Sequence, residues 1–547
     1  MKASFYETCI LSAEAGKAVW LGDLRASGAS APGAERLVLR LTDCGGAKED
    51  FPLFLPPWQG DGERDFALSM LSALIFNLLS ARGGCELQIF YRRENEALAA
   101  LVGELENVFQ LRQKARRGYG KAGNVSDRIS AALGGTPFSV TEEEIGRYRP
   151  LPRTAESVPP VMLHEKLRAA ADEAETSFCC GMDVGGTDVK LAVSRSGRLL
   201  LTREFDWNPA QSPTADGLID PLLALLDEAL EACGGGAFDA VGLSFPDVVI
   251  RDRIHGGETP KTRGLCENPA LDYEREFARL GGLREQMLSR CVPGGRVRIT
   301  NDGNMAAFSA AMELACGGET GLEGGVLAHT LDTDLGSGWL LPDGSVPELP
   351  LEMYDFLVDL GSFPQRRYAP WDLRSVCNEN SGLPGARRYL GQAACYRMAW
   401  ELKPSLLDGF IEERGGLLQI QSLPRDLRKP CLEHLMALAE EGVPETEEIF
   451  RRIGRHLAQV NREMDFILHP GTQTRYLYGR FVKRARCFAL IREGCAEVMP
   501  SLRLVAADEN LACSPLMLQL AQRPGVTVAQ FGQAVGAIYF ALVEERT

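Results

Sequence analysis

The sequence predicts an α/β protein of several domains. The chain has 547 residues, too many for one hydrophobic core and enough for about three or four domains of ordinary size. Strand-like apolar runs alternate along it with segments in which apolar residues recur at helical spacing. A glycine-bearing turn also separates two strand-like runs near Gly185. These patterns are typical of sheets covered by helices.

The first 150 residues are expected to form a small α/β domain, whose role the sequence does not identify. Strand-like runs occupy residues 37–41 and 86–91. A long apolar helix follows Gly62, and a charged helix spans residues 94–117.

No segment qualifies as a membrane span. The longest apolar candidate, residues 66–79, contains Asn77 and serines and is flanked by charge, so we interpret it as a buried helix. The N-terminus lacks the apolar segment of an export signal. We therefore expect a cytoplasmic protein without a membrane partner.

A proline-marked link and a helix, residues 151–177, connect this domain with the rest of the chain. The helix is expected at about residues 161–175. Beyond it, residues 218–233, 273–291 and 445–468 carry apolar residues at helical spacing, with strand-like runs between them. The remainder is therefore also α/β.

Residues 182–190, MDVGGTDVK, are the most informative segment. Gly185 and Gly186 can adopt positive φ and place no side chain before a ligand, so their N–H groups can point at a phosphate. Thr187 adds a hydroxyl donor. Residues 189–193 alternate as a strand rather than forming the helix that follows a Walker loop. A tight hairpin turn without a ligand explains the same residues.

Two later segments place polar residues at strand ends. Asn301 and Asp302 follow an apolar β segment and precede an apolar helix. Asp302 is therefore either a carboxylate at a functional cleft or the N-cap of that helix. Residues 327–338, LAHTLDTDLGSG, form a second turn with hydroxyl groups and glycines, followed by a strand at residues 339–341.

The order of these segments resembles the sugar-kinase branch of the actin, hexokinase and Hsp70 superfamily, and within it the ROK family. Four further segments are similar to family motifs: residues 241–247, 352–359, 477–481 and 531–541. The resemblance runs from about residue 178 to the C-terminus. It implies two actin-like (ribonuclease H-like) α/β lobes around a cleft, at residues 178–320 and 321–547, each with a mixed sheet.

The resemblance also implies residue roles in an ATP-dependent phosphorylation of a sugar or related polyol. Phosphoryl transfer needs a base near the attacking hydroxyl, and Asp302 would fill that role. Asn301, Glu352 and Asp355 would bind the substrate. The residues implied at ATP are Asp183, Gly185, Gly186, Thr187, Thr333, Gly336 and Gly479. Asp183 would act through Mg²⁺ or its waters.

Departures from the family pattern bear on these roles. Asp332 and Asp334 stand where the second phosphate loop of the family has glycines. A carboxylate 4 Å from a phosphate charge costs roughly 4 kcal/mol at an effective dielectric near 20, so these aspartates either hold Mg²⁺ or lie in a solvated turn. Asp355 replaces a histidine that contacts sugar and zinc. Only Cys377 and Cys395 stand where the family has its zinc cluster, so no structural zinc is expected.

The formal charge of −15 argues against nonspecific binding to nucleic acid or to an anionic membrane. A basic cluster is expected to solvate the end of a helix: Arg112, Lys114, Arg116, Arg117 and Lys121. The fifteen cysteines lack paired spacing and are expected to be reduced. The partners that the resemblance implies are a small-molecule sugar and a nucleotide, and a homodimer is left open.

Two functions from different classes stay open. One is an ATP-dependent kinase for a sugar or polyol, favoured by the joint presence of Asp183, the glycine turn and Asp302, because a pure binder needs no base. The other is a non-catalytic sensor that kept the cleft to bind a sugar or nucleotide, favoured by the aspartates of the second turn. A DNA-binding repressor, another outcome in this family, is disfavoured because the first 150 residues show strands and no helix-turn-helix pattern.

Overall fold

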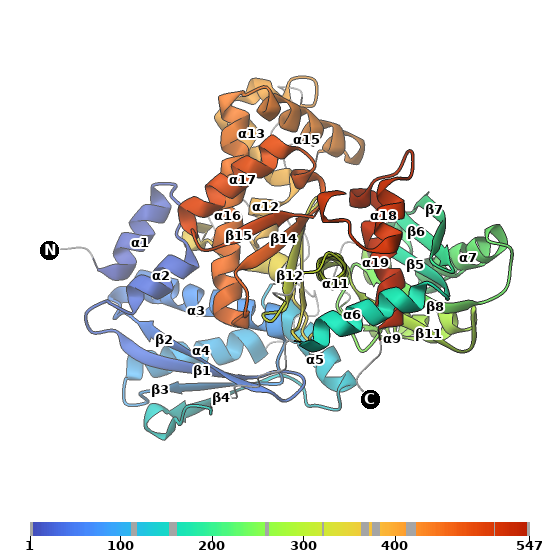
Figure 1. Cartoon of the computed structure of the whole chain (residues 1–547). Helices are drawn as coiled ribbons and strands as arrows, with labels where there is room; N and C mark the ends of the chain where they lie inside the picture. The colour runs from blue at the N-terminus through green and yellow to red at the C-terminus, as the bar shows by residue number, and fades with distance from the viewer. Residues whose placement is uncertain are drawn as a thin grey trace.

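The computed structural model describes the chain in ten stretches: residues 4–110, 118–152, 161–186, 188–256, 262–319, 322–362, 371–374, 383–411, 423–507 and 509–543. Within them lie three sheets of four or five strands and one two-stranded ribbon (Figure 1). One large sheet belongs to the N-terminal third and one to each predicted lobe. The predicted α/β fold with two lobes and an additional N-terminal α/β part is confirmed.

The N-terminal sheet has the order β2-β1-β3-β4. Its strands are β1 (Glu35–Thr42), β2 (Lys48–Leu55), β3 (Glu86–Tyr91) and β4 (Ser139–Glu144). The helices here are α1 (Phe5–Glu14), α2 (Leu21–Gly28), α3 (Gly60–Arg82), α4 (Glu96–Gln110) and α5 (Gly120–Ala132). By length and composition α3 would suffice to cross a membrane, but 78% of its apolar window is buried in the protein. The prediction of a buried helix at residues 66–79 is confirmed. Of the predicted charged helix, residues 111–117 lie outside the described residues.

The first-lobe sheet has the order β11-β8-β5-β6-β7. Its strands are β5 (Phe178–Val184), β6 (Asp188–Arg195), β7 (Arg198–Asp206), β8 (Phe238–Phe245) and β11 (Cys291–Asn301). Strands β5, β6 and β7 form an antiparallel meander, whereas β8 is parallel to β5 and β11. The other elements are α7 (Asp216–Ala232), β9 (Val249–Ile250), β10 (Arg253–Ile254), α8 (Arg263–Cys266), α9 (Tyr273–Ala278) and α10 (Leu283–Leu288).

The helix predicted over residues 273–291 is wrong in its extent. It is divided into α9 and α10 by a 3-10 turn, Arg279–Gly282, and residue 291 already opens β11. Gly281 and Gly282 stand at the break, and glycine disfavours a helix interior by about 1 kcal/mol relative to alanine.

The second-lobe sheet has the order β13-β12-β14-β15. Its strands are β12 (Val326–Leu331), β13 (Leu335–Leu340), β14 (Thr474–Tyr478) and β15 (Arg503–Ala506). Here too an antiparallel hairpin, β12–β13, continues into parallel strands, β14 and β15. Its helices are α12 (Arg387–Leu390), α13 (Gln392–Leu402), α15 (Arg425–Glu440), α16 (Pro444–Leu468) and α17 (Ala485–Val498). Helix α18 (Pro515–Ala521) follows β15 in the chain but packs on β7 of the first lobe.

Three helices lie between the two lobe sheets: α6 (Val161–Ala174), α11 (Asp302–Cys316) and α19 (Val528–Leu542). Helix α11 packs on β12 and β13. Helix α19 contacts β5, β6 and β8 of the first lobe, although it comes from the end of the chain (Figure 1, red). The C-terminal helix therefore completes the lobe that the chain began at β5.

The N-terminal third has its own sheet, but its apolar residues form one continuous core with those of the second lobe. Polar contacts reinforce this join. Asp359 accepts a hydrogen bond from Val19 N at 2.7 Å and another from the Tyr389 hydroxyl at 3.0 Å. Trp20 forms a β-bridge with Asp359. The N-terminal part is thus anchored to the second lobe, and this places its α5 near the cleft.

Candidate functional site

The predicted strand–turn–strand at residues 182–190 is the β5–β6 hairpin. Gly185 N donates to Asp188 O at 2.8 Å, which closes a tight turn. A Cβ on Gly185 would lie 3.0 Å from both the backbone and the carboxylate oxygen of Asp188, so the glycine is needed for close approach. Gly185 does not adopt a left-handed φ. Thr187 lies outside the described residues.

An acidic cluster lies at the carboxyl ends of β5 and β11. Asp183 accepts a hydrogen bond from Ser244 Oγ at 2.9 Å, and the same hydroxyl lies 3.3 Å from Gln533 Oε1 of α19. Burial raises the pKa of Asp183 to about 6, opposed by Lys190 and by the Ser244 hydrogen bond and reinforced by the charge of Asp302. Asp183 and Asp302 therefore share one electrostatic environment.

Lys190 faces this cluster rather than the solvent. Its ammonium pairs with Asp188, and its side chain is only 16% exposed. Burial disfavours its charge, but Asp183 and Asp188 outweigh this effect and raise the pKa of Lys190. Lys190 thus partly neutralises the acids of the first hairpin.

The sequence left Asp302 with two roles, helix N-cap or functional carboxylate, and the structure gives the N-cap position to Asn301. Asn301 is the N-cap of α11: its Oδ1 accepts from Gly303 N at 2.8 Å, and its Nδ2 donates to Asp247 O at 2.9 Å. Asp302 is the first residue of the helix, so the alternative that Asp302 is the cap is wrong. The half-buried Asp302 carboxylate accepts a hydrogen bond from Gly303 N at 2.8 Å, and its charge acts on Asp183.

The predicted substrate residues Glu352 and Asp355 lie in a 3-10 turn of the second lobe, and α5 reaches them. Lys121 Nζ donates to Asp355 Oδ2 at 2.6 Å and to the Tyr354 hydroxyl at 2.9 Å. The Lys121 and Asp355 side chains are 5% and 2% exposed. The expectation that Lys121 solvates a helix end is therefore wrong, because a carboxylate 234 positions away in sequence draws it into the interior.

Two carboxylates and one buried ammonium group lie together at the turn that holds Glu352, with Arg387 close by. Burial opposes the charge of Lys121, but Asp355 and Glu352 outweigh it and raise the pKa of Lys121. Burial raises the pKa of Glu352 to about 7, with Lys121 acting in the opposite direction. The other carboxylate oxygen of Asp355, Oδ1, is buried without a hydrogen-bond partner. One ammonium group thus serves two carboxylates.

The same helix also contacts the first lobe. Arg128 of α5 donates to Glu274 of α9 through Nε at 3.0 Å and Nη2 at 2.9 Å, and to the Gly256 carbonyl. Val125 and Ile129 form a small apolar cluster with first-lobe residues beside β9. Helix α5 therefore joins the first lobe to the second-lobe turn that holds Glu352.

The second predicted phosphate turn is already occupied by protein groups. Asp332 accepts a hydrogen bond from Gln392 Nε2 at 2.5 Å and lies 3.5 Å from Arg480 Nε. Burial raises the pKa of Asp332, while Arg480 and Gln392 lower it. A Cβ on Gly391 would lie 2.5 Å from Thr333 O, so the start of α13 covers the turn. This turn does not fit a polyphosphate as it stands.

Gly336 does not belong to that turn. It lies in β13, paired with Thr330, and a Cβ there would approach Thr330 Oγ1 to 2.2 Å. Gly338 plays a similar part, because its Cβ would lie 2.0 Å from the Gly303 backbone of α11. These glycines permit close packing, which explains them without a phosphate. Asp334 and Thr333 form the actual tip of the hairpin.

Gly479 is a turn residue, as predicted. It follows β14 with φ +99°, and a Cβ would lie 2.3 Å from Leu331 O. The cavity beside Tyr478, between α11, α18 and α19, holds about 10 Å³, room for one water.

No group of three or more His, Cys, Asp or Glu side chains is arranged to hold a metal ion in the part of the chain that the structure describes. Asp183 and Asp332 lie on different lobes and have protein partners. Of the two cysteines in the region of the family's zinc cluster, Cys395 is buried and Cys377 lies outside the described residues.

Comparison with known proteins gives similarity at the level of structure. A ROK family glucokinase from Streptomyces griseus, solved with glucose and AMPPNP, is 19% identical, with 66% of this chain and 99% of that chain covered and a TM-score of 0.42. A ROK hexokinase from Thermus thermophilus is 17% identical, with 66% and 98% covered and a TM-score of 0.39. A ROK family transcriptional regulator, a homologue of the E. coli MLC protein, is 14% identical, with 67% and 81% covered and a TM-score of 0.41. No protein-family model and no curated protein matches the chain. The α/β architecture of the chain itself rests on the sheets described above.

The predicted residues therefore fall into separate groups. The first lobe brings Asp183 and Asp302 together, and the second lobe holds Glu352 beside Asp355. Several residues that contact these acids or their partners have no functional role predicted from the sequence: Lys121, Ser244, Gln392, Arg480 and Gln533. The contact of Arg480 with Asp332 follows from the sheet, because β12 and β14 are parallel neighbours and the turns that follow them meet.

Proposed function

We propose that this chain is a ligand-binding regulatory protein built on a sugar-kinase fold, with its N-terminal part closing the cleft. The observation that carries the proposal is Lys121, which α5 inserts beside Asp355 and Glu352. An ammonium group in this position competes with a sugar hydroxyl for the same carboxylates. A sugar or related polyol that displaces Lys121 would move α5, and this movement would report the binding event.

The phosphate side supports the same proposal. A nucleotide would have to displace the Asp332 contacts with Arg480 and Gln392 before its phosphates could approach the second hairpin. Removing a charged partner from a part-buried ion pair costs free energy, so the apo cleft favours its own contacts over ATP.

A second candidate is the ATP-dependent sugar kinase with Asp302 as base. The observation that favours it is the first-lobe cluster, in which Asp183 keeps a pKa of about 6 beside Asp302 and Ser244. Perturbed carboxylates in a cleft are common at catalytic sites. The two candidates share a sugar site and differ in whether chemistry follows.

The deciding experiment combines calorimetry with an assay for ADP release, using a panel of sugars and polyols with and without ATP and Mg²⁺. For the regulatory protein we expect saturable binding of at least one sugar without ADP above the blank. Arg128→Gln, which loosens α5 without touching Asp355, should tighten that binding by about threefold or more. Lys48→Met, an exposed lysine of the N-terminal sheet, is the matched control and should change nothing.

Sugar-dependent ADP release that is lost in Asp302→Asn would overturn the regulatory proposal in favour of the kinase. Absence of binding by every sugar and polyol, in wild type and in Arg128→Gln, would reject both candidates.

A further inference from the structure

A groove runs along the free edge of the second-lobe sheet, away from the cleft. It lies between α17 and β15 and encloses about 780 Å³, within the range of protein ligand sites. Phe488 and Ala489 of α17 line one side, and residues 502–506 line the other. Strand β15 is the last of its sheet, and no strand pairs with its outer side within the described residues.

The backbone of β15 presents hydrogen-bonding groups to this groove. Arg503 N donates to Gln473 O and Ala507 N donates to Leu477 O, both at 2.9 Å, so alternate residues from 503 face β14. In a strand, the intervening residues direct their N–H and C=O groups to the opposite side. Leu504 and Ala506 therefore turn their backbone groups outward, which is the template that an added strand needs.

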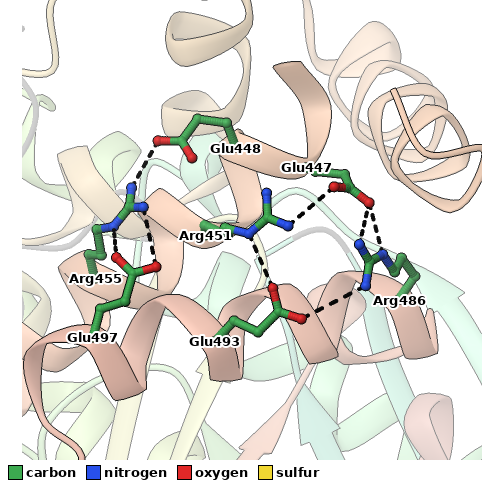
Figure 2. Close-up of polar contacts among 7 residues, drawn as sticks. All are labelled: Glu447, Glu448, Arg451, Arg455, Arg486, Glu493 and Glu497. Carbon is green, nitrogen blue, oxygen red and sulfur yellow. Dashed lines mark hydrogen bonds and ion pairs between the residues drawn. The ribbon is translucent and has the colours of Figure 1, made fainter. Parts of the chain in front are cut away.

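The acidic residues of α17 are neutralised by a ladder of ion pairs with α16 (Figure 2). Glu493 pairs with Arg451 at 3.1 Å and lies 3.8 Å from Arg486, and Glu497 pairs with Arg455 at 2.6 Å. The ladder extends along α16 to Glu447, the partner of Arg451 and Arg486. Negative charge on this helix is thus already matched.

Two arginines at the groove are left without such partners. Arg492 and Arg503 are exposed, and neither forms an ion pair with another described residue. Arg492 lies over the Phe488 ring at 5.9 Å, which holds its guanidinium at the groove wall. Glu493 also lines the groove but is paired with Arg451, so the two arginines make the groove locally positive, beside an open strand edge and on a chain with a formal charge of −15.

We propose that the groove binds an extended, acidic peptide segment of a partner protein, which adds as a strand to β15 and places carboxylates at Arg492 and Arg503. A second copy of this chain fits less well, because pairing β15 with another β15 would bring like charges together. Nucleic acid also fits less well, since a phosphate backbone needs a longer run of cations than two arginines.

The test uses fluorescence anisotropy with the full chain and a labelled peptide of three Glu-Val repeats as the probe. A peptide of three Lys-Val repeats and the oligonucleotide dT12 are the comparison probes. We expect the acidic peptide to bind at least tenfold more tightly than either. Combined Arg492→Glu and Arg503→Glu substitutions should weaken it at least tenfold, and Arg147→Glu, on the exposed surface of the N-terminal part, should leave it within twofold.

Ala506→Pro tests the backbone part separately, because it removes an outward N–H while the sheet bonds of β15 to β14 stay in place. We expect weaker peptide binding with an unchanged melting temperature. Equal affinity for the acidic and basic peptides, or an affinity that none of these substitutions alters, would overturn the proposal. Tighter binding of dT12 would assign the groove to nucleic acid. Dimerisation of the double arginine variant without peptide binding to wild type would assign the arginines to protecting the edge from self-association.

Discussion

The two lobes repeat one sheet arrangement but neutralise their carboxylates differently. In the second lobe, Asp355 is paired with Lys121 and Asp332 with Arg480, so cations from other elements complete both sites. In the first lobe, Asp183 has a hydrogen bond from Ser244 and shares its surroundings with Asp302, and its pKa is raised to about 6. The difference lies in the side chains, since both hairpins have the same strand pairing.

A carboxylate that already has a partner can bind a ligand only by exchange. The second lobe holds Asp332 and Asp355 in ion pairs, whereas in the first lobe Lys190 pairs with Asp188 and only partly offsets the charge of Asp183. Helix α5 contacts both lobes: Lys121 bonds to Asp355 of the second lobe, and Arg128 bonds to Glu274 of the first. Its contacts are where the comparison can be tested.

The largest effect is expected for Lys121→Met. It leaves Asp355 buried without its cation, and breaking a buried pair from one side typically costs about 3–5 kcal/mol of unfolding free energy. The double variant Lys121→Met with Asp355→Leu should recover most of this loss, because it leaves no unpaired charge. Urea denaturation measures both, with Lys48→Met as the exposed control. A loss below about 1 kcal/mol in the single variant would mean that the pair is solvated.

Asp302→Asn tests the first lobe. If the site transfers phosphoryl groups, turnover should fall about 100-fold, the usual scale for removing a general base, with little change in melting temperature. If the chain only binds, sugar affinity should stay within about twofold. Asn301→Ala is the structural control, since it removes the cap of α11 and should cost about 1 kcal/mol of stability. A large stability loss in Asp302→Asn with unchanged turnover would make Asp302 a structural residue.

The sequence predicted the fold further than it predicted the site, for a physical reason. The β5–β6 hairpin, α7 and α16 depend on local periodicity, which a sequence displays directly, whereas α19 was predicted only from the resemblance to the family. The pairing of Lys121 with Asp355 depends on tertiary packing between residues 234 positions apart, and its only local trace, a basic cluster, favoured a solvated helix end. The prediction that Gly336 lies at a phosphate has a related weakness. In sequence, a glycine at a close cross-strand contact looks the same as a glycine that approaches a phosphate.

The turn that holds Glu352 should also make the free energy of unfolding depend on pH. The pKa of Glu352 is raised from 4.5 to about 7, so the folded state holds this proton more tightly than the unfolded state. Its contribution to stability therefore falls as pH rises from about 4.5 to about 7 and is constant above that. Glu352→Gln should remove this fall, which makes the variant more stable than wild type at pH 8 by about 3 kcal/mol and equal to it near pH 4. Comparing the two proteins cancels the opposite effect of His329 and His456, whose pKa values burial lowers to about 4. A difference that does not change with pH would place Glu352 in contact with bulk water.

The smallest effect concerns the second hairpin. Asp332→Gly with Asp334→Gly restores the glycines of the family pattern and releases Arg480 from its ion pair. A freed guanidinium beside an uncharged turn should attract phosphate, so ATP affinity should rise by about tenfold or less and depend less on Mg²⁺. The single variant Asp334→Gly, which leaves the pair of Asp332 with Arg480 intact, is the matched control and should resemble wild type. Calorimetric titration of ATP with and without Mg²⁺ measures both. Identical curves for all three proteins would mean that the charge of this turn does not limit nucleotide binding, and the barrier would then lie with Gly391, whose backbone covers the turn whatever its charge.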